Sequence, residues 1–321
     1  MIEKYYDGAI EQVAAGLGTV EKNHLLVRYS GQFSVENLND TKQLEKNEDI
    51  FVQVHEFETG EITCAYEPYL TMICDGFRRY MTGTFEEFME TCDVYYLHRP
   101  VLLGYFNQDN TGREEIILLD EVAYEQERML AALERMLCAI ADRHPVLFVL
   151  NRFQLASKST MQLTARFLKC ENCNIGLVLG VSDIQAMPEF LVPDWEMLYE
   201  TLDDGSKIYH IGNSGRKKEE TIDDEKYVDY GSEKVYRKLQ NMVEFLDFDQ
   251  AAYYLETIER KIKFDNLLVD DAARFRMWLL FVKVSILRQD IPKALEICED
   301  LEKIHLAGKE EECAYEQDYL I

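Results

Sequence analysis

The sequence predicts an α/β domain, with a mostly parallel sheet and helices on both faces, followed by an all-α domain of helical hairpins. Three observations lead to this fold class. In the first two thirds of the chain, short apolar runs alternate with longer helical patterns, as in βαβ units. After residue 212 the sequence becomes polar and charged. From residue 231 onward only helical patterns follow.

The predicted strands are short, and several are nearly continuous in Val, Ile, Leu and Phe, as expected for strands buried on both faces. They cover residues 24–29, 50–57, 146–150, 175–179 and 207–211. The clearest helix pattern covers residues 124–142, where Met129, Leu133 and Ile140 fall on one apolar face. It ends before Pro145, because proline biases the preceding residue away from helix.

The change in composition predicts three segments: an α/β domain over residues 1–212, an acidic linker over residues 213–230 and a helical domain over residues 231–321. In the helical domain, the sequences DFDQA at residues 247–251 and DIPKA at residues 290–294 lie 43 residues apart. Each follows an apolar helix and opens another, and each resembles the turn of a tetratricopeptide-type hairpin. Two hairpins are fewer than the roughly three repeats that such arrays need for stability. We therefore expect the array either to lean on the first domain or to be truncated and to continue in a longer protein.

The charge balance excludes some partners. The chain has 60 acidic and 34 basic residues, for a net charge of −26, which disfavours nucleic acids and anionic membrane surfaces. The N-terminus lacks the pattern of a secretory signal, and no apolar run approaches the roughly 18 to 20 residues that span a bilayer. We expect a cytoplasmic protein with no membrane or nucleic-acid partner; the sequence does not indicate its oligomeric state.

Eight cysteines are spread through apolar and helical segments, which is typical of reduced cytosolic proteins. Only Cys170 and Cys173 have the spacing of a metal or redox pair. A structural zinc site would need a second pair or a histidine at comparable spacing, and none is adjacent. The sequence therefore predicts no metal site, and these two residues are interpreted as reduced thiols beside a turn.

Residues 124–182 allow a family resemblance to be stated. The long helix before Pro145 is followed by the strand VLFVL, the segment NRFQLA, the helix start SKST and the strand IGLVLG. This order resembles the core of the STAND class of AAA-like P-loop ATPases, and the resemblance extends over roughly residues 8–212. It implies a P-loop-NTPase-like sheet in the first domain and a role in signalling.

The phosphate-binding loop of that family, G-x-x-x-x-G-K-[ST], is not preserved. The loop surrounds phosphates with backbone N–H groups, a lysine and a hydroxyl that binds Mg²⁺. The first strand runs into Gly31, on which the motif can be aligned. Glu36 then replaces the second glycine, Asn37 the lysine and Leu38 the hydroxyl residue. Glu36 brings a negative charge where a triphosphate would lie.

The acidic pair of the family is also missing. In these ATPases the strand corresponding to residues 146–150 ends in two carboxylates, which hold Mg²⁺ and orient the attacking water. Here Asn151 and Arg152 occupy these positions. The amide of Asn151 is a weak neutral ligand, and the guanidinium of Arg152 stays protonated and cannot act as a base. The resemblance therefore implies a retained fold, no catalytic residues and no cofactor.

The leading hypothesis is a non-catalytic pseudo-ATPase that serves as a regulatory or scaffolding protein and binds a protein or peptide through its helical region. One alternative is a sensor that binds ATP or ADP without hydrolysing it; another is the N-terminal regulatory part of a larger signalling protein, such as a cyclase or a transcriptional regulator. A third is an enzyme activity at the carboxyl ends of the strands, for which the candidate residues are Ser30, Asn151, Arg152 and Asp183.

Overall fold

The computed structural model describes residues 2–17, 24–29, 49–58, 61–108, 121–170, 173–182, 187–204, 208–211 and 229–306. These residues belong to two units. The sheet unit combines residues 1–111 with residues 128–226, and the helical unit combines residues 112–127 with residues 227–321. The division thus falls inside one long helix, α6 (Val122–Ala141). The predicted linker, residues 213–230, lies almost wholly outside the described residues.

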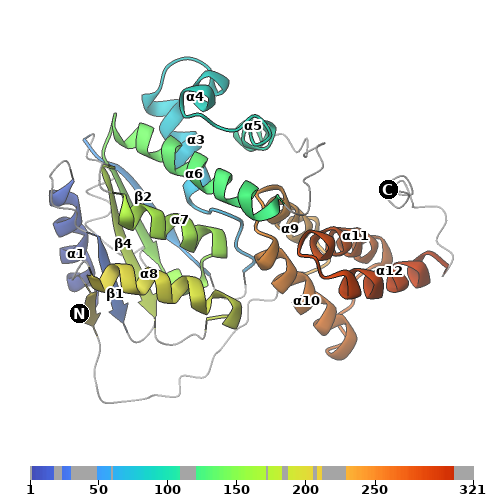
Figure 1. The fold of residues 1–321 in the computed structure, drawn as a ribbon. Helices are drawn as coiled ribbons and strands as arrows, with labels where there is room; N and C mark the ends of the chain where they lie inside the picture. Colours follow the sequence, from blue (N-terminus) through green and yellow to red (C-terminus); the bar gives the residue numbers. More distant parts are fainter. Residues whose placement is uncertain are drawn as a thin grey trace. The chain divides into compact units, whose positions relative to one another are not determined.

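The sheet unit contains a parallel sheet in the strand order β2-β3-β4-β1-β5 (Figure 1). The strands are β1 (Leu25–Tyr29), β2 (Phe51–Glu56), β3 (Val146–Asn151), β4 (Ile175–Ser182) and β5 (Ile208–Ile211). The helices, besides α6, are α1 (Ile2–Gly16), α3 (Tyr69–Tyr80), α4 (Phe85–Thr91), α5 (Arg99–Asn107), α7 (Lys158–Lys169) and α8 (Val192–Asp204). The prediction of an α/β fold with a parallel sheet is confirmed, and each predicted strand is present.

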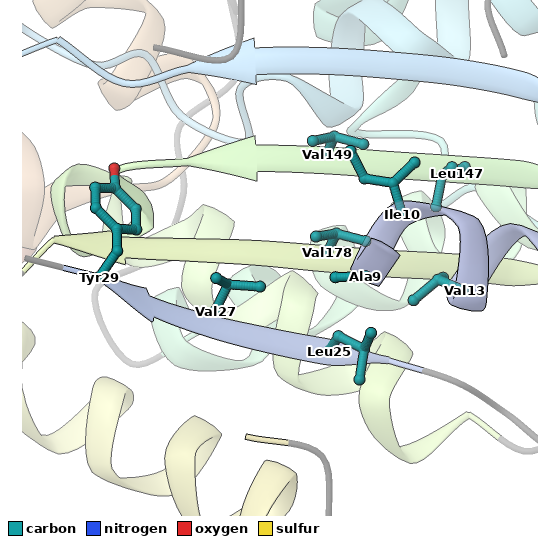
Figure 2. Packing of buried hydrophobic residues seen from close by; sticks show 9 residues of the cluster. All are labelled: Ala9, Ile10, Val13, Leu25, Val27, Tyr29, Leu147, Val149 and Val178. Atoms are coloured by element: carbon teal, nitrogen blue, oxygen red, sulfur yellow. The ribbon is translucent and has the colours of Figure 1, made fainter. Parts of the chain in front are cut away.

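One face of the sheet is covered by α1. Ala9, Ile10 and Val13 of this helix pack against side chains of β1, β3 and β4 (Figure 2). The approach is close at Gly176 of β4, where an added Cβ atom would lie 2.6 Å from Cγ1 of Val13. A glycine at this position therefore allows the helix to lie against the strand.

The opposite face is covered by other helices, with α7 and α8 on the far side of the sheet from α1 (Figure 1). Along β3 the side chains alternate, because neighbouring residues of a strand point to opposite faces. Leu147 and Val149 face α1. Phe148 contacts Tyr69 of α3 instead, with ring centroids 4.8 Å apart. All residues of β3 are buried, as the apolar run predicts.

The Ser/Thr-rich start of α7 fixes the segment that leads into α3. Ser157 caps α7 by accepting a hydrogen bond from the N–H of Thr160. The hydroxyl of Thr160 donates to the carbonyl of Glu67 at 2.9 Å, and the hydroxyl of Ser159 accepts from the N–H of Tyr66 at 3.1 Å. These contacts attach the chain before α3 to the end of the sheet at which β3 finishes.

The helical unit contains α9 (Glu233–Glu244), α10 (Phe248–Phe264), α11 (Asp271–Leu287) and α12 (Ile291–Leu306). The two turns singled out in the sequence have the same backbone geometry. The residue before each aspartate has a positive φ, 66° at Leu246 and 61° at Gln289. The N–H of the aspartate then donates to the carbonyl five residues earlier, at 2.7 Å for Asp247 and 2.8 Å for Asp290. The sequence echo thus corresponds to a repeated structural turn.

Candidate functional site at the carboxyl edge of the sheet

The carboxyl ends of the strands form the edge where parallel α/β sheets bind ligands. Of the predicted site residues, Asn151 and Arg152 are described and lie at this edge. Four others, Gly31, Glu36, Asn37 and Leu38, lie outside the described residues, as do Ser30 and Asp183 of the enzyme alternative.

Asn151 is the last residue of β3 and is fully buried. Its side-chain Oδ1 accepts a hydrogen bond of 2.7 Å from the hydroxyl of Tyr29, the last residue of β1. Strand β4 lies between these two strands, and its last residue, Ser182, is paired with Tyr29, so the Tyr29 side chain crosses the end of β4 to reach Asn151. Tyr29 stands on the face covered by α1 (Figure 2). The amide oxygen that could face a metal ion is therefore held by a tyrosine of the same sheet.

Arg152 follows β3 and has a positive φ of 53°, a conformation that L-residues adopt rarely. Its Nε lies 3.3 Å from Oε1 of Glu56, the last residue of β2. The register of β2 on β3 places Glu56 directly beside Asn151, which brings its carboxylate within reach of the next residue, Arg152. Both side chains are at most about one quarter exposed, since their exposed fractions are 27% for Arg152 and 18% for Glu56. The positive charge of Arg152 thus offsets the negative charge of Glu56, the last residue of β2.

Gln154 lies in the 3-10 turn η2 (Phe153–Leu155), which follows Arg152. It is 2% exposed, and its Oε1 accepts a hydrogen bond of 3.3 Å from the N–H of Ser182, at the end of β4. Its Nε2 has no hydrogen-bond partner among the described residues. A buried amide N–H without a partner costs free energy. The Nε2 of Gln154 can therefore donate a hydrogen bond to a ligand at the carboxyl edge.

The pKa of Tyr29 is shifted. Burial raises the pKa of this hydroxyl from 10.0 to about 12, although the positive charge of Arg152 lowers it in part. The phenol therefore stays neutral and keeps its proton for Asn151 well above neutral pH.

This shift predicts a loss of stability in alkaline solution. Between about pH 10 and pH 12, Tyr29 of the unfolded chain releases its proton while Tyr29 of the folded chain keeps it, so stability falls as pH rises through this interval. The contribution of Tyr29 is on the order of 2 kcal/mol. We expect Tyr29→Phe to remove this share of the pH dependence. The measurement is urea unfolding at several alkaline pH values.

Trp195 of α8 and Trp278 of α11 are the two tryptophans of the chain, one in each unit. Fluorescence in a Trp278→Phe background therefore follows the sheet unit alone. Tyr96→Phe is the matched control, since Tyr96 is 61% exposed. If the free energy of unfolding falls equally steeply with alkaline pH in Tyr29→Phe and in the parent protein, Tyr29 is not the group responsible, and the prediction is contradicted.

The sequence identified Asn151 and Arg152 but not the residues that bind them. Tyr29 ends the predicted strand 24–29 and Glu56 lies inside the predicted strand 50–57, and nothing in their local sequence marks them. A strand order would have been needed to place them beside β3.

Comparison with known protein families and with curated proteins finds no match to this chain. In the described part of the chain, no helix combines the length and the apolar character that are needed to cross a bilayer.

Proposed function

We propose that this chain is a non-catalytic regulatory or scaffolding protein, built on a P-loop-NTPase-like sheet that has lost its nucleotide chemistry. In this proposal the sheet unit is a structural platform, and the helical unit binds a protein or peptide partner in the cytoplasm. Neither unit acts on nucleic acid, in keeping with the net charge of −26.

The strand order supports the P-loop-like assignment. AAA-like ATPases place the strand that precedes the phosphate loop between the fourth and fifth strands of the sheet, and the strand with the acidic pair beside the fourth. Here β1 lies between β4 and β5, and β3 lies beside β4. In this arrangement Asn151 and Arg152 correspond to the acidic pair.

The observation that carries the proposal is the way these two side chains are bound. Asn151 accepts a hydrogen bond from Tyr29, and Arg152 pairs with Glu56. Phosphoryl transfer needs carboxylates at this position, to hold Mg²⁺ and to orient water. The side chains present are a neutral amide, which is bonded to Tyr29 of β1, and a cation, which is paired with Glu56 of β2.

Exposed apolar side chains support partner binding by the helical unit. Phe264 is 76% exposed and Leu268 is 95% exposed, at and just beyond the end of α10. On α12, Ile291 and Leu295 are exposed one turn apart. Large exposed apolar side chains on a helical array are typical of surfaces that bind peptides or proteins.

We expect no ATP hydrolysis. With saturating MgATP, phosphate release by the full chain should equal the protein-free background, because the catalytic carboxylates are absent. The double variant Asn151→Asp, Arg152→Glu should also remain inactive, because the sequence has Asn37 in place of the loop lysine. Phosphate release by the parent protein that Asn151→Ala abolishes would contradict the proposal and favour an enzyme.

A second candidate, a nucleotide sensor, is favoured by one observation. The Nε2 of Gln154 is a buried donor without a partner among the described residues, at the edge where a ligand would bind. Saturable binding of ADP that Gln154→Leu weakens at least tenfold would favour the sensor. Gln162→Leu is a matched control, since its amide donates to Asp194 between α7 and α8.

A further inference from the structure

Three cysteine side chains gather at one corner of the sheet unit. Cys138 belongs to α6, Cys170 follows the last residue of α7, and Cys173 precedes β4. Their Sγ atoms all lie within 4.8 Å of one another, and the Sγ atoms of Cys138 and Cys173 are 2.6 Å apart. The sequence identified only Cys170 and Cys173, and the structure adds Cys138 from a helix 32 residues upstream.

The backbone on both sides of the cluster is held in place. The N–H of Cys170 donates to the carbonyls of Arg166 and Phe167, which closes α7. After Cys173, the carbonyl of Asn174 accepts a hydrogen bond of 3.0 Å from the N–H of Val146, at the start of β3. Cys138 lies within a helix, and Cys170 and Cys173 lie next to hydrogen-bonded backbone at the end of α7 and before β4, which favours a preorganised binding site.

An ion pair links α6, which carries Cys138, to α7, which ends next to Cys170. Nη1 of Arg166 lies 2.8 Å from Oε2 of Glu134. Glu134 precedes Cys138 by one turn of α6, and Arg166 precedes Cys170 by one turn of α7. Both side chains of this pair are 25% exposed, so it is partly shielded from water. It links the two helices one turn before Cys138 and one turn before Cys170.

We propose that Cys138, Cys170 and Cys173 form a binding site for a thiophilic divalent cation of the Zn²⁺ class. Zinc binds cysteine sulfur at about 2.3 Å, which places tetrahedral ligand sulfurs about 3.8 Å apart. The three Sγ atoms reach this spacing if those of Cys138 and Cys173 move about 1 Å farther apart. Rotation of the side chains can supply this movement.

The chemistry of the donors selects the class of metal. Thiolate ligands favour zinc and similar soft cations over Mg²⁺ and Ca²⁺, which prefer oxygen. The cation replaces the thiol protons, which pass to the solvent. Three protein ligands leave a fourth tetrahedral position for water or an exchangeable ligand. Cys138 and Cys170 are partly exposed, which gives a cation access.

Nearby charges favour a cation. Cys138 experiences the negative charges of Glu134, one turn before it on α6, and of Asp142, just beyond the last residue of α6. On α7, Arg166 is paired with Glu134, and Lys169 adds one positive charge beside Cys170. Three thiolates and these carboxylates outweigh the two cations.

Titration of the full reduced chain with Co²⁺, a spectroscopic substitute for Zn²⁺, tests the site. We expect one equivalent of Co²⁺ to produce thiolate-to-cobalt charge-transfer absorption, which Zn²⁺ then abolishes by displacement. Loss of even an outer-shell partner lowers metal affinity by about 10- to 100-fold. Because Cys138→Ser removes a ligand itself, it should weaken Co²⁺ binding by at least about 10-fold. Cys298→Ser, in α12, is the matched control and should bind as the parent does.

A second measurement does not depend on the folding of variants. In the parent chain, Zn²⁺ should slow alkylation of Cys138, Cys170 and Cys173, read residue by residue by mass spectrometry, and leave Cys298 unaffected. Absence of the charge-transfer band, or equal alkylation rates with and without Zn²⁺, would overturn the proposal. A band unchanged in Cys138→Ser would also overturn it, because the site would then not contain the third cysteine.

Discussion

Replacement of Phe148 by alanine is expected to lower the free energy of unfolding of the sheet unit by about 3–5 kcal/mol, the range for large aromatic residues in a core. Phe148 is fully buried in the middle of β3. Its ring packs edge-on against Tyr69, whose own ring lies 5.4 Å from Phe167 of α7. The cavity would therefore open between the sheet and two of its covering helices.

Urea unfolding followed by Trp195 fluorescence in the Trp278→Phe background measures this loss in the sheet unit. Phe148→Leu preserves most of the volume and should cost less than half as much. Tyr96→Ala is the surface control, because Tyr96 is 61% exposed. A loss below about 1 kcal/mol for Phe148→Ala would contradict the placement of Phe148 in a closely packed core.

Replacement of Lys293 by methionine is expected to lower the stability of the helical unit by about 2–4 kcal/mol, because it removes one partner of a buried carboxylate. The side chain of Glu259, in α10, is 8% exposed. It accepts hydrogen bonds from Lys293 at 2.8 Å and from Lys263 at 2.7 Å. Lys263 is 40% exposed, so its interaction is weakened by solvent and compensates only in part.

Lys303→Met is the matched control for this prediction. Lys303 also lies on α12 and pairs with an acidic residue, Asp300, at 2.8 Å, but its side chain is 71% exposed. Its loss should leave stability unchanged within error, as for most surface ion pairs. Trp278 fluorescence in a Trp195→Phe background reports the helical unit. Equal effects of the two lysine substitutions would show that burial of Glu259 is not what gives Lys293 its importance.

Local sequence was sufficient to predict the strands of the sheet unit and its longest helix. Residues 146–150 and 175–179 are apolar runs, and both are strands buried along their whole length. The helix predicted over residues 124–142 is α6, Val122–Ala141. These features depend on hydrophobic periodicity and on a proline, which act over a few residues.

The helical unit shows where periodicity alone is insufficient. On α12, Leu295 is 62% exposed, whereas the apolar residues Ala294 and Leu301 of the same helix are buried. Ile297 is buried instead. A helix with apolar residues on two sides has no unique buried face until its neighbour is known, and here the face that contacts α11 decides.

The contacts of the candidate site could not be predicted because they join residues far apart in the sequence. Tyr29 and Asn151 are separated by 122 residues and meet only through the strand order. Cys138 reaches Cys170 and Cys173 only when α6 and α7 lie side by side. Such juxtapositions follow from topology and have no local sequence signal.

Calorimetric titration of the full chain with MgATP, and separately with ADP, tests most directly whether the carboxyl edge has lost its nucleotide chemistry. We predict no saturable heat for either nucleotide, in the parent protein and in Gln154→Leu alike. The loop positions that would bind phosphates hold Glu36 and Asn37, and Asn151 and Arg152 offer no carboxylate for Mg²⁺ and are bound by Tyr29 and Glu56. A saturable signal with a micromolar dissociation constant would contradict the pseudo-ATPase proposal.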